Sequence, residues 1–225
     1  MKNIFFAAVM LISVSVAAQD TTKKAMNPKF VAAMQKQVDI LDTAFAPATL
    51  QNCYNAIERI SNAEKGEWLP YYYMAYCLIL ESYSAETSQM DEYCDKADQL
   101  IKRADSLSPK NSEIYILRSM SASSRIMVNP MKRGAKFGKM SSMYLDTAQS
   151  LDSTNPRVPL MRGQGYYYTP PAFGGGKDKA KPVLEDAVKK YDAFIPASTI
   201  APHWGKARAQ MLVADCDKPG EKKKK

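Results

Sequence analysis

Two stretches of this chain share one pattern. Residues 104–113 read Ala-Asp-Ser-Leu-Ser-Pro-Lys-Asn-Ser-Glu, and residues 148–157 read Ala-Gln-Ser-Leu-Asp-Ser-Thr-Asn-Pro-Arg. In each stretch an alanine, two polar residues and a leucine end an amphipathic segment, and a short turn ending in asparagine leads into the next segment. Recurrence of such a junction is the sequence signature of stacked structural units. The two stretches therefore predict helix–turn–helix junctions in a repeated array.

The segments on either side of these junctions extend the helical pattern along the chain. Apolar residues recur at three- and four-residue spacing between Pro and Gly residues, and there is no convincing alternation of the kind typical of β-strands. Because most links are short, neighbouring helices should form antiparallel hairpins. The expected helices span residues 28–43, 48–62, 68–84, 88–107, 111–127, 136–151, 156–168, 176–192 and 202–216.

The junctions resemble the boundary between two tetratricopeptide (TPR) repeats, where the family pattern is A-x-x-L-D-P-x-N-P. In the first copy, Ala97, Ile101, Ala104 and Pro109 fall on the family's second-helix and inter-repeat positions. The resemblance covers about residues 48–192 and implies an all-α fold, a right-handed superhelix of antiparallel helical hairpins (a TPR-like α-solenoid). A generic stack of helical hairpins is the alternative.

The second copy matches at Leu145 and Ala148, and then at Gly163 and Tyr166 in the following first helix. The chain also departs from the family. Successive junctions are 44 and 39 residues apart, against a family period of about 34. The first-helix Trp-Leu-Gly pattern is mostly absent, and Arg118 stands near a position where the family has an apolar leucine. These departures indicate insertions, one of them near residues 128–135.

Two tyrosine triplets, residues 71–73 and 166–168, fall in first helices of different repeats. The resemblance implies that first helices line a concave groove that holds a peptide or partner segment. Tyrosine suits such a surface because it joins a large apolar ring to a polar tip. The alternative is that these rings fill seams between helices. The predicted groove residues are Tyr72, Tyr73, Tyr115, Tyr166 and Tyr167.

Residues 173–177 read Phe-Gly-Gly-Gly-Lys. A nucleotide-binding phosphate loop is excluded, because Pro171 stands in place of its first glycine and Asp178 in place of its Ser or Thr. The backbone N–H groups beside Lys177 could still bind a carboxylate or phosphate. We therefore predict an anion site at Gly174, Gly175, Gly176 and Lys177, with a flexible interhelical link as the alternative.

Residues that could support catalysis are few. His203 is the only histidine, and the carboxylates of residues 91–98 have the spacing of a solvated helix face. The sequence accordingly predicts a protein that is not an enzyme, with no metal and no cofactor. Four cysteines, at positions 53, 77, 94 and 216, permit disulfides in an exported chain but leave their pairing open. A basic cluster (Lys132, Arg133, Lys136 and Lys139) could receive acidic side chains or lipid head groups, or be a solvated loop.

The chain begins with an export signal. Lys2 precedes an apolar run over residues 4–18, and Val16 and Ala18 are the small residues expected before a cleavage site at Gln19. No later stretch is apolar enough to span a membrane. We expect a signal peptide over residues 1–18, a TPR-like domain over residues 19–217 and a disordered Lys-rich tail over residues 218–225.

Composition and charge exclude some classes of protein. Hydrophobic residues make up 46% and charged residues 24%, as in a folded domain. Much of the formal charge of +8 lies in the tail, so no nucleic-acid partner is expected. The sequence predicts an exported bacterial member of the TPR-like family, periplasmic or secreted, that binds a protein or peptide partner of the cell envelope in its groove. The alternative is a periplasmic carrier of a small anionic ligand at the glycine loop, associated with transport.

Overall fold

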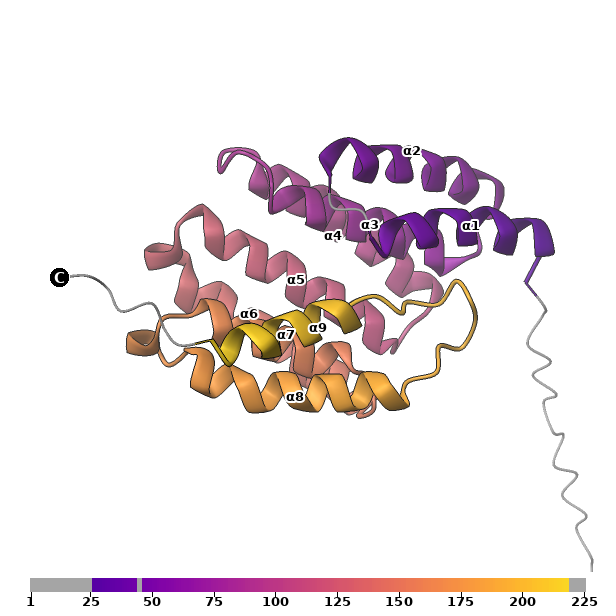
Figure 1. Cartoon of the computed structure of the whole chain (residues 1–225). Coiled ribbons are helices and arrows are strands. Elements are labelled where there is room, and N and C mark those ends of the chain that lie inside the picture. Colours follow the sequence, from indigo (N-terminus) through magenta and orange to yellow (C-terminus); the bar gives the residue numbers. More distant parts are fainter. Residues whose placement is uncertain (1–25, 44–45, 219–225) are drawn as a thin grey trace, which may run out of the picture.

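The computed structural model describes residues 26–43 and 46–218. Within these ranges it contains nine α-helices, one short 3₁₀ helix and no strand, so the all-α prediction is confirmed (Figure 1). The helices are α1 (Pro28–Leu41), α2 (Pro47–Ala63), α3 (Trp68–Ser82), α4 (Met90–Leu107), α5 (Ser112–Val128), α6 (Pro130–Leu151), α7 (Arg157–Tyr168), α8 (Lys177–Ala193) and α9 (Lys206–Cys216), with the 3₁₀ helix η1 (Pro171–Phe173) between α7 and α8.

Asparagine and proline determine where several helices begin. The side chain of Asn111 accepts a hydrogen bond from the backbone N–H of Glu113, which caps α5. Asn129 does the same for Lys132 at 3.1 Å, and Pro130 occupies the first position of α6. Such caps satisfy backbone donors that have no partner inside the helix. Helix α6 therefore starts at residue 130 and not at 136, and the expected insertion over residues 128–135 is mostly helical.

Helices that follow one another in the chain pack against one another, as short connections require. Helix α5 makes further contacts with α3 and α7, so these three odd-numbered helices form an inner row. Helix α3 is buried on nearly every side, which explains its almost continuously apolar sequence. Small residues at Ala97, Ala104 and Ala148 are buried in the helix seams and allow close approach of the backbones.

Gly163 in α7 is one of the residues on which the TPR resemblance rests, and the packing shows why glycine stands there. A Cβ at this position would lie 2.6 Å from side-chain carbons of Leu184 in α8. Real Cβ atoms do not approach other carbons so closely, so a larger residue would push α7 and α8 apart. The position is therefore a close contact between two helices of one hairpin.

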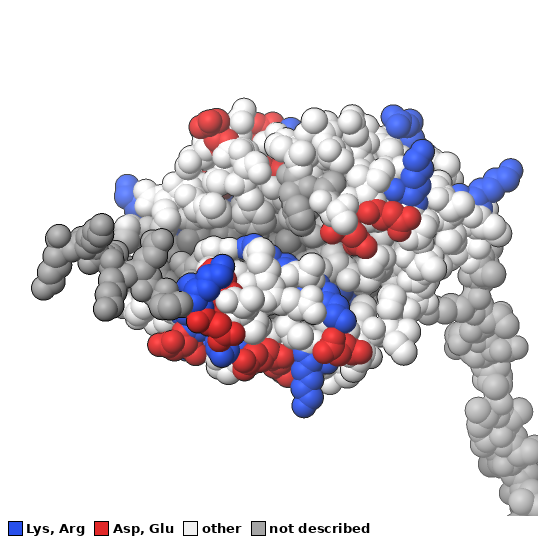
Figure 2. Space-filling view, in the orientation of Figure 1, with Lys and Arg blue, Asp and Glu red and all other residues white. Residues whose placement is uncertain are grey.

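The C-terminal part of the chain turns back over the stack, and α9 lies across α7 and α8 in Figure 1. The space-filling view shows acidic and basic side chains mixed over the lower half of this face (Figure 2). No helix among the described residues is long and apolar enough to cross a membrane. The expected signal peptide and residues 219–225 of the expected tail lie outside the described residues, so both remain predictions.

Candidate functional site

The first tyrosine triplet lies in the core. Tyr72 and Tyr73 are at most 1% exposed. The hydroxyl of Tyr73 donates to the carbonyl oxygen of Ile200 at 3.1 Å, and the indole N–H of Trp204 donates to the hydroxyl of Tyr72 at 2.9 Å. The chain's own residues 200–204 therefore cover the surface on which a partner was expected, and these two rings offer no exposed area.

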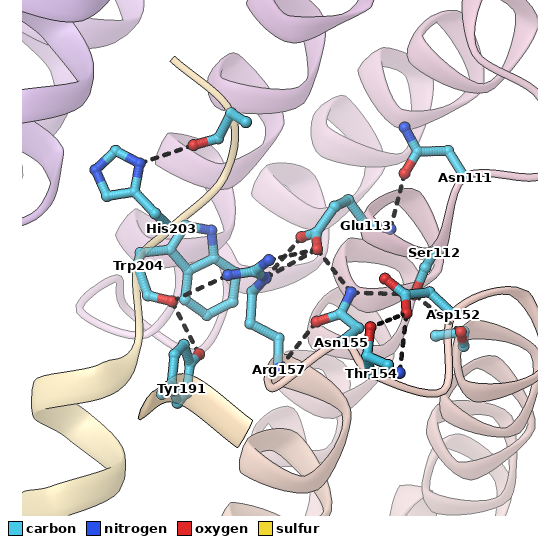
Figure 3. Close-up of polar contacts among 12 residues, drawn as sticks. Asn111, Ser112, Glu113, Asp152, Thr154, Asn155, Arg157, Tyr191, His203 and Trp204 are labelled. Carbon is cyan, nitrogen blue, oxygen red and sulfur yellow. Dashed lines mark hydrogen bonds and ion pairs between the residues drawn. The ribbon is translucent and has the colours of Figure 1, made fainter. Parts of the chain in front are cut away.

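A buried ion pair between Arg157 and Glu113 lies beside Tyr72, and Figure 3 shows this pair with Asn155 and Trp204 around it. Arg157, 1% exposed, donates from Nη2 to Oε1 of Glu113 at 2.6 Å and from Nε to Oε2 at 2.8 Å. Asn155 donates to the same carboxylate at 2.6 Å, and the hydroxyl of Tyr72 donates to it at 3.2 Å. Burial alone would lower the pKa of Arg157, but the charge and hydrogen bonds of Glu113 outweigh it and raise the pKa. The guanidinium of Arg157 is thus held in its charged form.

The same cluster fixes the returning segment. The carbonyl oxygen of Trp204 accepts a hydrogen bond from the hydroxyl of Tyr191 at 2.9 Å. The indole of Trp204 stacks on the ring of Tyr76, with the ring centroids 4.8 Å apart. His203 bonds to Asp42 and to the carbonyl oxygen of Ala201, each at 2.8 Å. We call this region the sealed face; it comprises Tyr72, Tyr73, Tyr76, Glu113, Arg157 and Trp204. Its polar groups serve to hold the chain together.

The glycine run does not present free donors. The N–H groups of Gly174, Gly175 and Gly176 donate to the carbonyl oxygens of Pro171, Pro170 and Tyr166. Lys177 forms an ion pair with the carboxylate of Asp215 at 2.8 Å and also donates to its carbonyl oxygen. The ammonium of Lys177 holds the pKa of Asp215 well below its usual range, with further hydrogen bonds from Tyr167 and Lys218. The groups predicted to hold an anion are therefore engaged in joining α8 to α9.

The other predicted tyrosines are half-buried and lie in two separate places, Tyr166 and Tyr167 in α7 and Tyr115 in α5. Tyr166 lies beneath the ammonium of Lys179, 4.6 Å from its ring centroid, and Tyr167 donates its hydroxyl to Asp215. Tyr115 lies next to Tyr144, with centroids 6.4 Å apart. The structure thus does not bring the five predicted groove tyrosines together on one surface.

An open cleft lies instead between α4, α5 and α6. Its volume is about 500 Å³. Ile101 of α4 and Ala122 of α5 line it, and Phe137, Met140 and Tyr144 form one face of α6 toward it. Residues at positions i, i+3 and i+7 share a helix face, and this α6 face is the apolar wall. We call this space the α4–α6 cleft.

Charged side chains line both ends of the α4–α6 cleft. At one end Arg118 donates to Asp105 at 2.7 Å, and Lys102 lies one turn before Asp105 on α4. At the other end Arg125 donates to Asp95 and Asp98, each at 2.7 Å. Burial would lower the pKa of Arg125, but these carboxylates raise it.

A shallower hollow of about 370 Å³ continues beyond Arg125. It contains Lys132, Lys136 and Asp91, and Asp91 binds Arg133 through two hydrogen bonds. The basic cluster found in the sequence therefore lies on a helix beside the cleft.

Sequence reasoning does not identify this cleft. Met143, which precedes Tyr144 in α6, is exposed, whereas Tyr144 lines the cleft. The i, i+3, i+7 spacing of Phe137, Met140 and Tyr144 is the available signal. Arg118, a departure from the TPR pattern, is the second signal, because it lines the cleft.

The cysteines and the other possible metal ligands among the described residues do not form a site. Cys53, Cys77 and Cys94 are buried thiols in helix seams, and Cys216 is a half-buried thiol. Among the described residues no group of three or more His, Cys, Asp or Glu side chains is placed to hold a metal ion.

We compared the chain with family models, curated proteins and solved structures. No family model matches the chain, so the TPR resemblance is not confirmed. No curated protein matches it either. Among solved structures, the chain is similar to the HusA haemophore from Porphyromonas gingivalis, with 36% sequence identity and a TM-score of 0.76 over 86% of this chain and 95% of that chain. This likeness contradicts the predicted scaffold for a protein partner, because a haemophore is a carrier of a small ligand.

Proposed function

The chain belongs to the family of the HusA haemophore, and from this membership we propose that it is an exported carrier of haem or a closely related tetrapyrrole. The observation that carries the proposal is the 36% identity across 95% of the haemophore chain. The small-ligand carrier, which is the second hypothesis from the sequence, is thus favoured over the scaffold. In this role the protein binds and releases a ligand and catalyses no reaction.

The α4–α6 cleft is the site that we assign to the ligand. Haem is a flat and mostly apolar macrocycle with carboxylates at one edge. The cleft volume of about 500 Å³ falls within the 300–1,000 Å³ typical of small-molecule sites. Its apolar wall on α6 and the Ile101 and Ala122 side chains opposite suit the faces of such a ring.

The donor set of the cleft also fits haem. Haem iron in proteins is held by His, Cys, Met or Tyr side chains. Met140 and Tyr144 are the residues of these types that line the cleft, so they would provide an iron ligand. His203 is bonded to Asp42 and Ala201 on another part of the molecule. The ligand's iron, when bound, would accept a lone pair from one of the two α6 residues.

The architecture that holds the cleft forms part of the proposal. We infer that the hairpins stack as a right-handed superhelix of the TPR-like kind. Sequential packing of the helices and the inner row of α3, α5 and α7 support this inference. In that arrangement α4 and α6 belong to neighbouring hairpins, and α5 forms the floor of the cleft between them.

Export is the third part of the proposal, supported by the signal-like residues 1–18 and by an apolar run too short to span a bilayer. We propose that cleavage before Gln19 releases the chain into the periplasm or the medium. Mass spectrometry of protein recovered from the medium and the envelope checks this point. A product that retains Met1 contradicts it.

A titration with haemin tests the ligand assignment. Purified protein lacking residues 1–18 should give a saturable change in the haem absorption band with one equivalent bound. Tyr144→Ala removes a ring from the cleft wall and should weaken binding about tenfold, as loss of an aromatic anchor does at other binding sites.

The matched control is Tyr168→Ala, because Tyr168 is 62% exposed at the end of α7 beside the glycine loop. It should leave the affinity unchanged. Loss of binding in Tyr168→Ala with retention in Tyr144→Ala would move the site to the glycine loop. A wild-type protein that does not bind haemin would contradict the proposed function itself.

A further inference from the structure

The two ends of the α4–α6 cleft differ in how their charges are used. At the Arg125 end, Asp91, Asp95 and Asp98 surround the guanidinium, with Nη–Oδ distances of 3.5, 2.7 and 2.7 Å. Asp91 is also paired with Arg133 at 2.7 Å. The carboxylates here are paired with Arg125 and Arg133, and the lysines of this end, Lys132 and Lys136, line the adjoining hollow and not the cleft itself.

At the Arg118 end, some basic hydrogen-bond donors have no acidic partner among the described residues. Arg118 gives one Nη to Asp105 at 2.7 Å, but its Nε–H is buried with no hydrogen-bond partner among the described residues. A buried N–H without a partner is unfavourable, and a ligand oxygen that reaches it would supply the missing acceptor. Lys102 is exposed on the rim, and none of the ion pairs among the described residues includes it.

Tyr144 lies at the same end of the cleft. The Arg118 guanidinium lies 5.3 Å from the ring centroid of Tyr115, and Tyr115 is the ring that neighbours Tyr144. This contact helps to hold the guanidinium in place, because a cation over an aromatic face is attracted by the ring. The guanidinium of Arg118 is thus fixed at the mouth of an apolar space.

We propose that the cleft orients its ligand by the carboxylate edge, with Arg118 and Lys102 as the residues that recognise the carboxylates. The apolar part of the macrocycle then extends past Ile101 and Met140 toward Phe137. The inference rests on the proposed function and adds a specificity to it: the protein selects tetrapyrroles with free carboxylates at one edge. Arginine and lysine are suited to this task, since both remain charged and donate to carboxylate oxygens.

A pair of probes separates carboxylate recognition from ring binding. Metal-free mesoporphyrin IX carries two free carboxylates, and its dimethyl ester has the same ring without the charges. Wild-type protein should bind the diacid at least tenfold more tightly than the ester, measured by porphyrin fluorescence. Lys102→Ala and Arg118→Gln should each lose about five- to tenfold in affinity for the diacid and nothing for the ester; the glutamine retains an amide donor toward Asp105.

Lys132→Ala is the matched control, because Lys132 is an equally exposed lysine beyond the Arg125 end. It should change neither affinity, and thermal melts should show that all three variants remain folded. If Lys132→Ala loses the preference for the diacid while Lys102→Ala and Arg118→Gln keep it, the carboxylates bind at the Arg125 end. That result would overturn the inference. Equal binding of diacid and ester by the wild type would overturn it while leaving the proposed function intact. Binding of neither probe by a protein that binds haemin would overturn the inference alone, and binding of neither the probes nor haemin would remove the proposed function as well.

Discussion

The sealed face and the α4–α6 cleft both include residues of helix α5, but the first is covered by the chain and the second is open. Glu113 at the start of α5 is enclosed by Arg157, Asn155 and Tyr72. Arg118, a turn and a half later, lines a cleft of about 500 Å³. The aromatic residues are concentrated on the sealed face, whereas the open surface has fewer of them. A concentration of aromatic residues in this sequence therefore marks a buried seam and not the open cleft.

The difference arises because the chain covers one surface with its own residues. Trp204 brings an indole to Tyr72 and Tyr76, and the segment that carries it ends in α9, which packs on α8. Burial of several large rings in one place stabilises the fold, since each buries about 150–250 Å². The α4–α6 cleft has no such covering segment among the described residues. Its apolar surface therefore remains available to a ligand.

The largest effect of any variant should come from the buried ion pair. Glu113→Ala removes the carboxylate and leaves the Arg157 guanidinium buried without its partner, which should cost about 3–5 kcal/mol of unfolding free energy. Denaturant melts of the variant and the wild type measure this loss of unfolding free energy. Asp105→Ala, at the half-exposed ion pair of the cleft, is the control and should cost about 0–1 kcal/mol. Equal losses in the two variants would mean that the sealed face is not more tightly built than the cleft.

A smaller loss is expected where the returning segment turns into α9. Gly205 has a positive φ of 111°, and a Cβ there would clash with the hydroxyl of Tyr191 and lie 2.7 Å from Leu160. Gly205→Ala should destabilise the protein by about 1–3 kcal/mol, as overpacking does. Near-ultraviolet circular dichroism should report a changed environment of Trp204.

Gly165→Ala supplies the control for this change. Gly165 lies within α7, and a Cβ added there would meet no atom of another element within 4 Å. Alanine favours the helix there by about 0.5–1 kcal/mol, so the melt should shift upward slightly. A destabilised Gly165→Ala together with an unaffected Gly205→Ala would contradict the account of the returning segment.

Helices can be predicted from the sequence because their signals are local. Pro, Gly and Asn residues set most boundaries within two residues of the observed ones. The exceptions are α6 and α9. The sequence puts the start of α6 six residues late, since Gly134, Gly138 and several lysines give that stretch the composition of a loop. It puts the start of α9 four residues early, because Trp204 and Gly205 form a fixed turn and not a first helical turn.

The site cannot be predicted in the same way, because it depends on contacts between distant residues. Nothing near Tyr72 in the sequence indicates that Trp204 will cover it. The α4–α6 cleft draws its walls from residues 98–144, and only the α6 wall has a periodic signal of its own. The class of ligand that we propose rests on the likeness to the haemophore, because neither composition nor helix spacing indicates it.

The smallest effect concerns the acid dependence of the Arg125 end. Asp91 is 37% exposed and accepts hydrogen bonds from Arg133 at 2.7 and 2.8 Å, which lower its pKa below the ordinary 3.8. Because the folded pKa is depressed, the stabilisation is fully present above pH 3.8 and is lost as the pH falls through the lower folded value. After allowance for solvent screening, Asp91→Asn should cost about 0.5 kcal/mol at pH 7.

Denaturant melts at pH 7 and at pH 2.5 test the sign of this effect. The difference between wild type and Asp91→Asn should shrink at the lower pH, since the wild-type carboxyl is then increasingly protonated and its pairing with Arg133 weakens. Glu92→Gln is the neighbouring control, because Glu92 pairs only with the exposed Lys96 on its own helix and should contribute little at either pH. A difference for Asp91→Asn that stays constant between the two pH values would show that the rim of the cleft is held by the shape of the side chain and not by its charge.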